Sequence, residues 1–304
     1  MKRIIVMLAA LAVCMGVYAQ SERFEQRYDL LVSQFGPAGV GVQTVLDNWA
    51  KVDSTDAKML LGRFSYYYAK AQSTQVVKKS ENRYLGMEPV LSLKDSTGAD
   101  VHYFQVTVFD DALYAEAVKA ADKAIAVWPD RIDFRFMKAN AYIAYEKESP
   151  DMAFAYLSSL IDENSCRSKP WSYEGEEKDE DFFQDAMQEY CYSFFRIATP
   201  ASYEAFYALS SKLASRYPDN MSFLNNMGSY HLVARNDYKN AYKCYDKVLK
   251  MHPDDNTAIM NGMLAARKQK NVKKEKKYLE LMVRYGSEKD SRLAKGRLEG
   301  LNMK

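Results

Sequence analysis

The sequence predicts an all-α fold made of antiparallel helical-hairpin repeats, with one small β-hairpin inserted. Of 304 residues, 48% are hydrophobic and 27% are charged, which is the composition of a chain with a folded core. With 13 glycines and 8 prolines, the chain is poor in the turn residues of a β-sandwich. Pro218 and Pro253 lie 35 residues apart and each follows an amphipathic helical pattern, as Pro129 does. This period is typical of stacked helical hairpins.

Residues 1–19 predict a secretory signal peptide. The chain begins Met-Lys-Arg, residues 4–13 are an unbroken apolar run, and residues 17–19 read Val-Tyr-Ala. This order of basic, apolar and small residues is typical of signal-peptidase cleavage, here after Ala19. The alternatives are a buried N-terminal helix and a lipoprotein modified at Cys14. We expect an exported protein, periplasmic or outer-membrane-associated in a Gram-negative bacterium, without a transmembrane helix after cleavage.

Charge and cysteine content argue against several kinds of site. Without Lys2 and Arg3 the chain has 40 basic and 40 acidic residues, so no basic excess favours nucleic acid. Acidic residues dominate 162–189 and basic residues dominate 264–304, which indicates solvated faces, mutual docking of these segments, or a charged partner. The remaining cysteines, Cys166, Cys191 and Cys244, have no CxxC spacing. We expect no metal and no cofactor.

After residue 19, helical patterns follow one another in pairs. Residues 20–54 contain the first pair, at 22–35 and 40–52, and residues 287–304 contain a C-terminal capping helix at 290–298. Between them, helical patterns cover 57–71, 111–128, a region around 139–142 and another around 155–160, 182–197, 202–216, 256–268 and 272–285. The alternative is a set of generic helical hairpins without a repeat family, which would leave the fold class unchanged.

Residues 221–255 carry the most specific pattern. Leu224-x-x-Met227-Gly228 is followed by Tyr238-x-x-Ala241-x-x-x-Tyr245-x-x-Val248 and by Pro253. This pattern resembles the tetratricopeptide repeat family, and the resemblance extends over most of 55–286. It implies a right-handed superhelix of stacked hairpins. It also implies structural roles for Gly228, Tyr238, Ala241, Tyr245, Val248 and Pro253, with small residues where two helices approach. One extra residue within 229–237 departs from the family's length.

Two insertions interrupt the repeats. Residues 73–110 contain β-rich segments at 89–94 and 101–109 around a turn at 95–100, with apolar faces formed by Leu91, Leu93, Phe104, Val106 and Val108. A two-stranded hairpin is marginal alone, so we expect it to pack on the helices or to pair with a partner's strand. Residues 165–181 are acidic, include Trp171 and Tyr173, and indicate a mobile surface loop.

The sequence contains no recognised catalytic motif, so we expect no enzymatic activity. The resemblance implies that first helices line an inner wall that receives an extended peptide or a partner's helix. The corresponding positions are Phe136, Asn140, Asn225 and Ser229, for which a solvated helix face is the alternative. We expect an exported scaffold that binds a protein in the cell envelope, with the partner docking near 73–110. The alternatives are a glycan- or small-ligand-binding envelope protein and an enzyme of unrecognised type.

Overall fold

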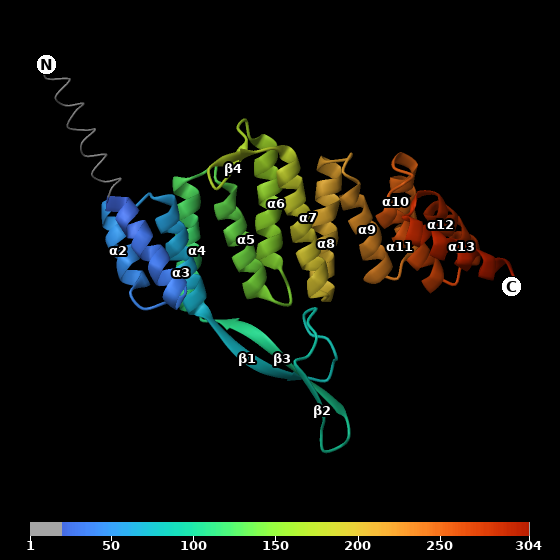
Figure 1. The fold of residues 1–304 in the computed structure, drawn as a ribbon, viewed down its shortest axis with the longest axis horizontal. Coiled ribbons are helices and arrows are strands. Elements are labelled where there is room, and N and C mark those ends of the chain that lie inside the picture. Colours follow the sequence, from blue (N-terminus) through green and yellow to red (C-terminus); the bar gives the residue numbers. More distant parts are fainter. Residues whose placement is uncertain (1–19, 304) are drawn as a thin grey trace. The chain divides into compact units, whose positions relative to one another are not determined.

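The computed structural model describes residues 20–303, which are mostly helical and include a small antiparallel sheet (Figure 1). The all-α fold class is confirmed at this level. The chain divides into two compact units, the first containing residues 20–146 and 167–180 and the second containing 147–166 and 181–303. The predicted signal peptide, residues 1–19, lies outside the described residues.

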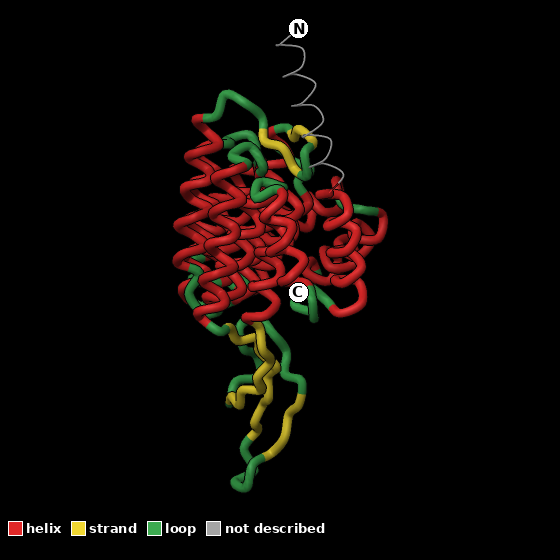
Figure 2. The backbone as a smooth tube through the Cα atoms, turned by 90° about the vertical axis from the view of Figure 1, so that its left-hand side faces the viewer, coloured by secondary structure: helices red, strands yellow, loops and turns green. Residues whose placement is uncertain are grey.

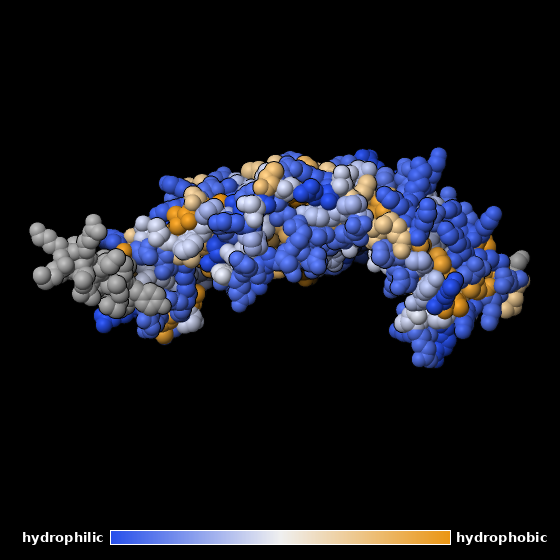
Figure 3. Space-filling model, turned by 90° about the horizontal axis from the view of Figure 1, so that it is seen from above, coloured by the Kyte–Doolittle hydropathy of each residue, from blue (hydrophilic) through white to orange (hydrophobic). Residues whose placement is uncertain are grey.

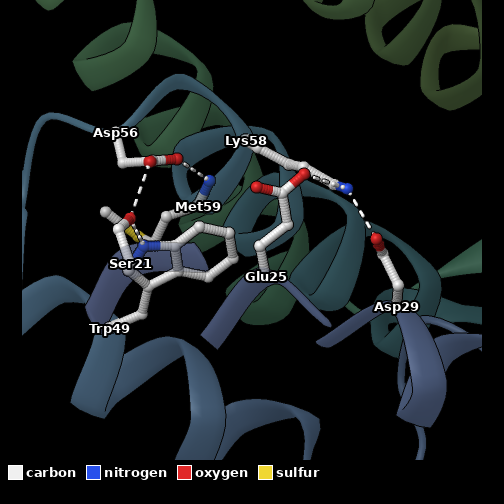
Figure 4. Close-up of polar contacts among 7 residues, drawn as sticks. All are labelled: Ser21, Glu25, Asp29, Trp49, Asp56, Lys58 and Met59. Atoms are coloured by element: carbon white, nitrogen blue, oxygen red, sulfur yellow. Dashed lines mark hydrogen bonds and ion pairs between the residues drawn. The ribbon is translucent and has the colours of Figure 1, made fainter. Parts of the chain in front are cut away.

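The first unit begins with a helix over residues 20–35, followed by α2 (Val42–Val52) and α3 (Ala57–Ala71). Figure 4 shows how these helices are joined around the fully buried Trp49. The Ser21 hydroxyl accepts a 2.6 Å hydrogen bond from the Trp49 indole nitrogen and donates one of 3.0 Å to Asp56. Because Asp56 also caps α3, one carboxylate links the first helix to the start of the third.

Lys58 forms a second link between the same helices (Figure 4). Its ammonium group lies 2.8 Å from the Glu25 carboxylate and 2.7 Å from that of Asp29. Both acids lie on the first helix, four residues apart, so they share one face of it. Ion pairs this exposed contribute little stability each, and the buried Trp49 is the main contact.

Helix α4 (Asp111–Val127) packs directly against α3, although some forty residues separate them in the chain. The intervening segment leaves at Ala71 and returns at Asp110, whose backbone N–H donates a 2.8 Å hydrogen bond to the Ala71 carbonyl. Small residues of α4, among them Ala117, Ala121 and Ala124, are fully buried and permit this close approach. Residues 72–109 are therefore inserted between α3 and α4, which pack together as a helical hairpin despite the insertion.

Helix α5 (Ile132–Glu146) follows α4, and residues 167–180 fold back onto its start. Where the sequence predicted a mobile loop, the structure has a hairpin of β4 (Trp171–Tyr173) and β5 (Glu176–Lys178). Trp171 is buried, with the guanidinium of Arg167 3.5 Å and that of Arg135 4.7 Å from its ring. Arg167 also bonds the Asp130 carboxylate at 2.6 Å. These cation–π contacts hold residues 167–180 against the start of α5, although the acidic composition of the segment had predicted a loop.

The second unit is made of consecutive helices. They are α6 (Asp151–Cys166), α7 (Glu180–Ile197), α8 (Pro200–Arg216), α9 (Met221–Val233), α10 (Tyr238–Met251), α11 (Asn256–Lys268), α12 (Val272–Tyr285) and α13 (Glu288–Asn302). The short connections α9–α10 and α11–α12 join helices that pack directly, as expected of antiparallel hairpins. The predicted bounds of α11 and α12 are those observed, and the predicted cap is α13.

The same glycine–tyrosine contact closes two successive hairpins. A Cβ at Gly228 would lie 2.8 Å from Cζ of Tyr245, and a Cβ at Gly262 would lie 2.7 Å from Cδ1 of Tyr278. The two glycines are 34 residues apart, and both tyrosines are fully buried. Only the absence of a side chain lets α9 approach α10, and α11 approach α12, at these points.

The other signature positions pack as helix-core or helix-end residues. Ala241 and Val248 are fully buried on α10, whereas Tyr238, its first residue, is partly buried. Pro253 follows the end of α10, where the His252 N–H still bonds the Val248 carbonyl. Because proline lacks an N–H, it cannot continue the helix at this point.

A buried carboxylate joins the last three helices. Glu275 on α12 accepts hydrogen bonds from Nε of Arg267 on α11 at 3.0 Å and from Nε of Arg297 on α13 at 2.9 Å. Burial alone would raise its pKa, but the hydrogen bonds from Arg297 and Arg267 outweigh it and hold the pKa below the usual range. Glu275 is therefore ionised at neutral pH.

Candidate functional site

Residues 72–109, here called the sheet arm, form the most distinctive surface of the first unit. They contain β1 (Gln72–Lys79), β2 (Leu91–Lys94) and β3 (Asp100–Phe109) in the order β1-β3-β2, antiparallel throughout. The predicted hairpin corresponds to β2 and β3, and β1 was missed. Figures 1 and 2 show the strands extending away from the helix ends at which α3 and α4 meet them.

An aromatic cluster fixes the base of the sheet arm. Phe109, the last residue of β3, lies with its ring centroid 5.6 Å from Tyr68, 5.4 Å from Tyr114 and 5.8 Å from Tyr145. Tyr114 and Tyr145 stack at 4.1 Å, and the Tyr145 hydroxyl donates to Asp111. The cluster packs the last residue of β3 against α3, α4 and α5, and so anchors the base of the arm to the helices.

The two faces of the arm differ. Phe104 and Val106 point to one face and are buried there, with the Tyr84 ring 5.8 Å from Phe104. Lys79 lies on the same face, 4.2 Å from the centre of the Tyr84 ring. The segment between β1 and β2 therefore supplies the cover that a lone sheet face lacks.

The opposite face presents apolar side chains to solvent. Val76 is 64% exposed, Leu91 50% and Leu93 49%. The strand register places all three on one side of the sheet, with Leu91 opposite Tyr103 and Leu93 opposite Val101. The prediction that Leu91 and Leu93 lie on an apolar face is met by the register, but no described residue buries them. Thr74, Lys78 and Gln105 share this side of the sheet, and we call its exposed apolar residues, Val76, Leu91 and Leu93, the apolar face of the arm.

Elsewhere, exposed apolar residues are dispersed. On the surface seen in Figure 3, hydrophobic side chains form small groups among hydrophilic ones. In the second unit, Met260 (49% exposed) and Leu264 (43%) lie one helical turn apart on α11. This pair belongs to a first helix of a hairpin, where the predicted inner wall would lie.

The four predicted groove residues fall in different units. Phe136 is buried and Asn140 exposed on α5, in the first unit, whereas Asn225 and Ser229 lie on α9, in the second. The Asn225 amide is buried and donates to the Asp255 carboxylate, which caps α11. The Asn225 donors are therefore engaged within the protein rather than presented to a peptide.

Amide side chains that the sequence analysis did not single out connect the first helices of the second unit. Gln188 on α7 and Asn226 on α9 exchange two hydrogen bonds, the shorter of 2.8 Å, and Asn220 donates to Gln184 at 3.0 Å. Farther along, Asn261 on α11 donates to Ser229 at 3.3 Å. The i,i+4 spacing of Gln184 and Gln188 was the available signal, but their partners are more than thirty residues away.

An open acidic pocket of about 550 Å³ lies where α7, α9 and α11 begin. Its lining includes Asp181, Asp219, Asp254 and Asp255, together with His252. Asp255 accepts from the Ala258 backbone as the cap of α11, and acidic residues are favoured at helix N-termini. In the described part of the chain, no group of three or more His, Cys, Asp or Glu side chains is arranged to hold a metal ion.

The burial and the contacts of the cysteines and histidines determine their protonation and accessibility. Cys191 and Cys244 are buried, and burial raises their pKa values to about 12 and about 11, so both thiols are protonated at neutral pH. Cys166 is free and exposed. Burial lowers the pKa of His231 on α9, which favours its neutral form. His102 lies on β3 beside Ser92, and its Nδ1 is 2.8 Å from the serine hydroxyl.

Comparisons with known proteins are negative for this chain: no family model matches it, and no curated protein matches it. Within residues 20–303, none of the helices has both the length and the apolar character needed to cross a membrane.

Proposed function

We propose that this chain is an exported scaffold of the tetratricopeptide class that binds a protein partner in the cell envelope, with the sheet arm as its principal docking surface. The repeated glycine–tyrosine contact of α9–α10 and α11–α12 supports the repeat class. A right-handed superhelix of such hairpins is part of the same proposal. The export and envelope location are supported by the basic, apolar and small-residue pattern of residues 1–19.

The apolar face of the arm is the observation that carries the binding assignment. Val76, Leu91 and Leu93 are each about half exposed or more, on a sheet whose base packs on the helices through the Phe109 cluster. Exposed apolar surface that the protein's own core does not use is typical of interaction sites.

A protein partner fits these side chains better than a glycan. Glycan binding uses platforms of neighbouring exposed aromatic rings, whereas the most exposed aromatic side chains of residues 20–303 are Phe35, Trp128 and Tyr192, which lie on or at the end of three separate helices. The arm instead presents branched aliphatic side chains beside strand backbone, which is the surface that protein segments use when they add to a sheet.

Paired variants test the assignment. Changing Leu91 and Leu93 together to Ser removes apolar side chains that are already half exposed, so the fold should persist. Changing Met260 and Leu264 to Ser is the matched control, since those side chains are similarly exposed on a first helix. The readout is the set of proteins recovered by mild crosslinking and affinity purification from envelope extract of the source organism. We expect the arm variant to lose specific partners that the wild type and the control retain.

A deletion gives an independent test. Ser73 pairs with Val108 in the ladder, so an Asn-Gly turn can replace residues 74–107 and close a short hairpin while retaining Phe109. Helical circular dichroism should be preserved and the partners lost. If partners are recovered in full from both arm variants, docking at the arm is wrong. If the control on α11 loses them instead, binding belongs to the helical wall.

A further inference from the structure

Strand β1 is an open edge of the sheet. It pairs with β3 on one side, and no other strand of residues 20–303 pairs with its second side. Because the Asp110 N–H bonds the Ala71 carbonyl, antiparallel alternation turns the odd-numbered residues of β1 towards β3. The even-numbered residues therefore direct their backbone groups outwards. The Gln72 N–H is already bonded to Ala69, which leaves Thr74, Val76 and Lys78 with free outward N–H groups and carbonyls.

This edge has little of the protection that edge strands usually carry. Residues 72–79 contain no proline or glycine, and the strand pairs with β3 without a bulge over its eight residues. Its two lysines lie at the far end, and Lys79 is turned to the Tyr84 ring. Residues 72–76 are all exposed. The opposite edge is shorter, because β2 has only four residues.

We propose that β1 pairs antiparallel with β1 of a second copy of this chain, with the two-fold axis at Val76. In this register Val76 lies opposite itself, and Thr74 lies opposite Lys78 of the second copy. Each outward N–H of Thr74, Val76 and Lys78 then bonds an outward carbonyl of the second copy, because in this register the even-numbered residues of one strand pair with even-numbered residues of the other. A shift of two residues would bring in Gln72, whose N–H is committed to α3, or would leave one of the three without a partner.

The side chains suit this register. The two Val76 side chains, each 64% exposed as a monomer, would contact one another on the apolar face. Each Lys78 would lie opposite Thr74 and each Lys79 opposite Ser73, so no like charges are opposed. With 40 basic and 40 acidic residues after residue 19, two copies do not repel one another at long range. Charge therefore does not oppose the pairing either locally or overall.

The expected dimer is weak and reversible. A pair of eight-residue strands buries less than the roughly 1,200–2,000 Å² typical of stable interfaces. We therefore expect association with a dissociation constant of about 1–100 μM. It would be favoured where copies are concentrated. The pairing does not depend on whether the arm also binds another protein, so it can fail while the proposed function holds, and the reverse.

The first test is sedimentation of the full chain without residues 1–19 over a concentration series from about 1 μM to about 500 μM, which extends beyond the expected dissociation constant. Val76→Lys places two positive charges opposite each other at the two-fold axis. Val90→Lys is the control, because it makes the same change at a valine that is 63% exposed and immediately precedes β2. The wild type and Val90→Lys should approach twice the monomer mass, whereas Val76→Lys should stay monomeric with unchanged helical circular dichroism. A wild type that is monomeric throughout, or a Val76→Lys variant that still dimerises, overturns the proposal.

A crosslinking test reports the register itself. In a Cys166→Ser background, Val76→Cys places two thiols opposite each other across the axis, at a backbone separation compatible with a disulfide. Thr74→Cys places its thiols four positions apart, or about 13 Å at the rise of a strand. Mild oxidation should give a disulfide-linked dimer at least about tenfold faster with Val76→Cys than with Thr74→Cys. Equal rates would overturn the register.

Discussion

Replacing Gly228 with Ala tests the contact that defines the repeat. The added Cβ would lie 2.8 Å from Cζ of Tyr245 and closer still to Cε1, and Tyr245 is fully buried. Because the ring has no free space to move into, overpacking should cost about 1–3 kcal/mol. Alanine gains about 1 kcal/mol over glycine within a helix. The net expected change is therefore a loss of up to about 2 kcal/mol.

Urea unfolding followed by helical circular dichroism measures this difference directly. A loss at the upper end of that range should also lower the melting temperature by up to about 8 °C for a unit of this length. Gly296 supplies the matched control, because a Cβ there meets nothing within 4 Å. Gly296→Ala should therefore stabilise α13 by about 0.5–1 kcal/mol. Gly262→Ala should repeat the loss through Tyr278. If Gly228→Ala stabilises the protein as Gly296→Ala does, α9 does not approach α10 as described, and the repeat assignment loses its main support.

Three further outcomes are expected. Ala241→Leu overpacks a fully buried site and should lower the free energy of unfolding by about 1–3 kcal/mol, whereas Lys273→Leu at an exposed site should change it little; equal effects in urea titration would refute the assigned register of α10. Glu275 has a depressed folded pKa, so its stabilisation is present above the unfolded pKa near 4.5 and is lost as pH falls through the folded value. Glu275→Gln should therefore lower the free energy of unfolding at neutral pH by about 1–3 kcal/mol, a range that allows for the screening of the half-exposed arginines by solvent. The variant should also lose less stability than the wild type as the pH falls, and an unchanged pH profile would contradict the ion network. Intact mass of the exported protein should correspond to a chain starting at Gln20, cyclised to pyroglutamate, which removes a positive charge from a helix start; retention of Met1 would refute the export prediction.

Local signals were sufficient for most helices. Residues 256–268 and 272–285 were predicted with their observed bounds because the helical pattern lies within each segment, and the structure shows that Asp255 and Asn271 cap these helices. The same holds for 57–71, where Asp56 caps the helix. The small residues Gly228 and Ala241 also predicted where α9 and α10 approach closely, whereas the tyrosine that each glycine contacts was not predicted.

The candidate surface was only partly visible in the sequence. The alternation of residues 101–109 predicted β3 and the insertion itself, and the turn residues predicted its hairpin with β2. Strand β1 was missed because residues 72–79 are mostly polar and continue directly from α3. Its strand conformation depends on pairing with residues some thirty positions later, and no local pattern reports such a partner.

The sequence by itself determined the helical class, the repeat spacing and the place of both insertions, because each follows from short-range periodicity, caps and turn residues. Only the tertiary structure decided which side chains are exposed to solvent and can contact a partner. It exposes Leu91 and Leu93 on one face of the arm, whereas Phe104 on the other face is covered, and it buries Asn225 against Asp255. It also orders the acidic segment around Trp171 through arginines distant in the chain. Exposure depends on what packs across a surface, and that contact is made by residues far apart in sequence.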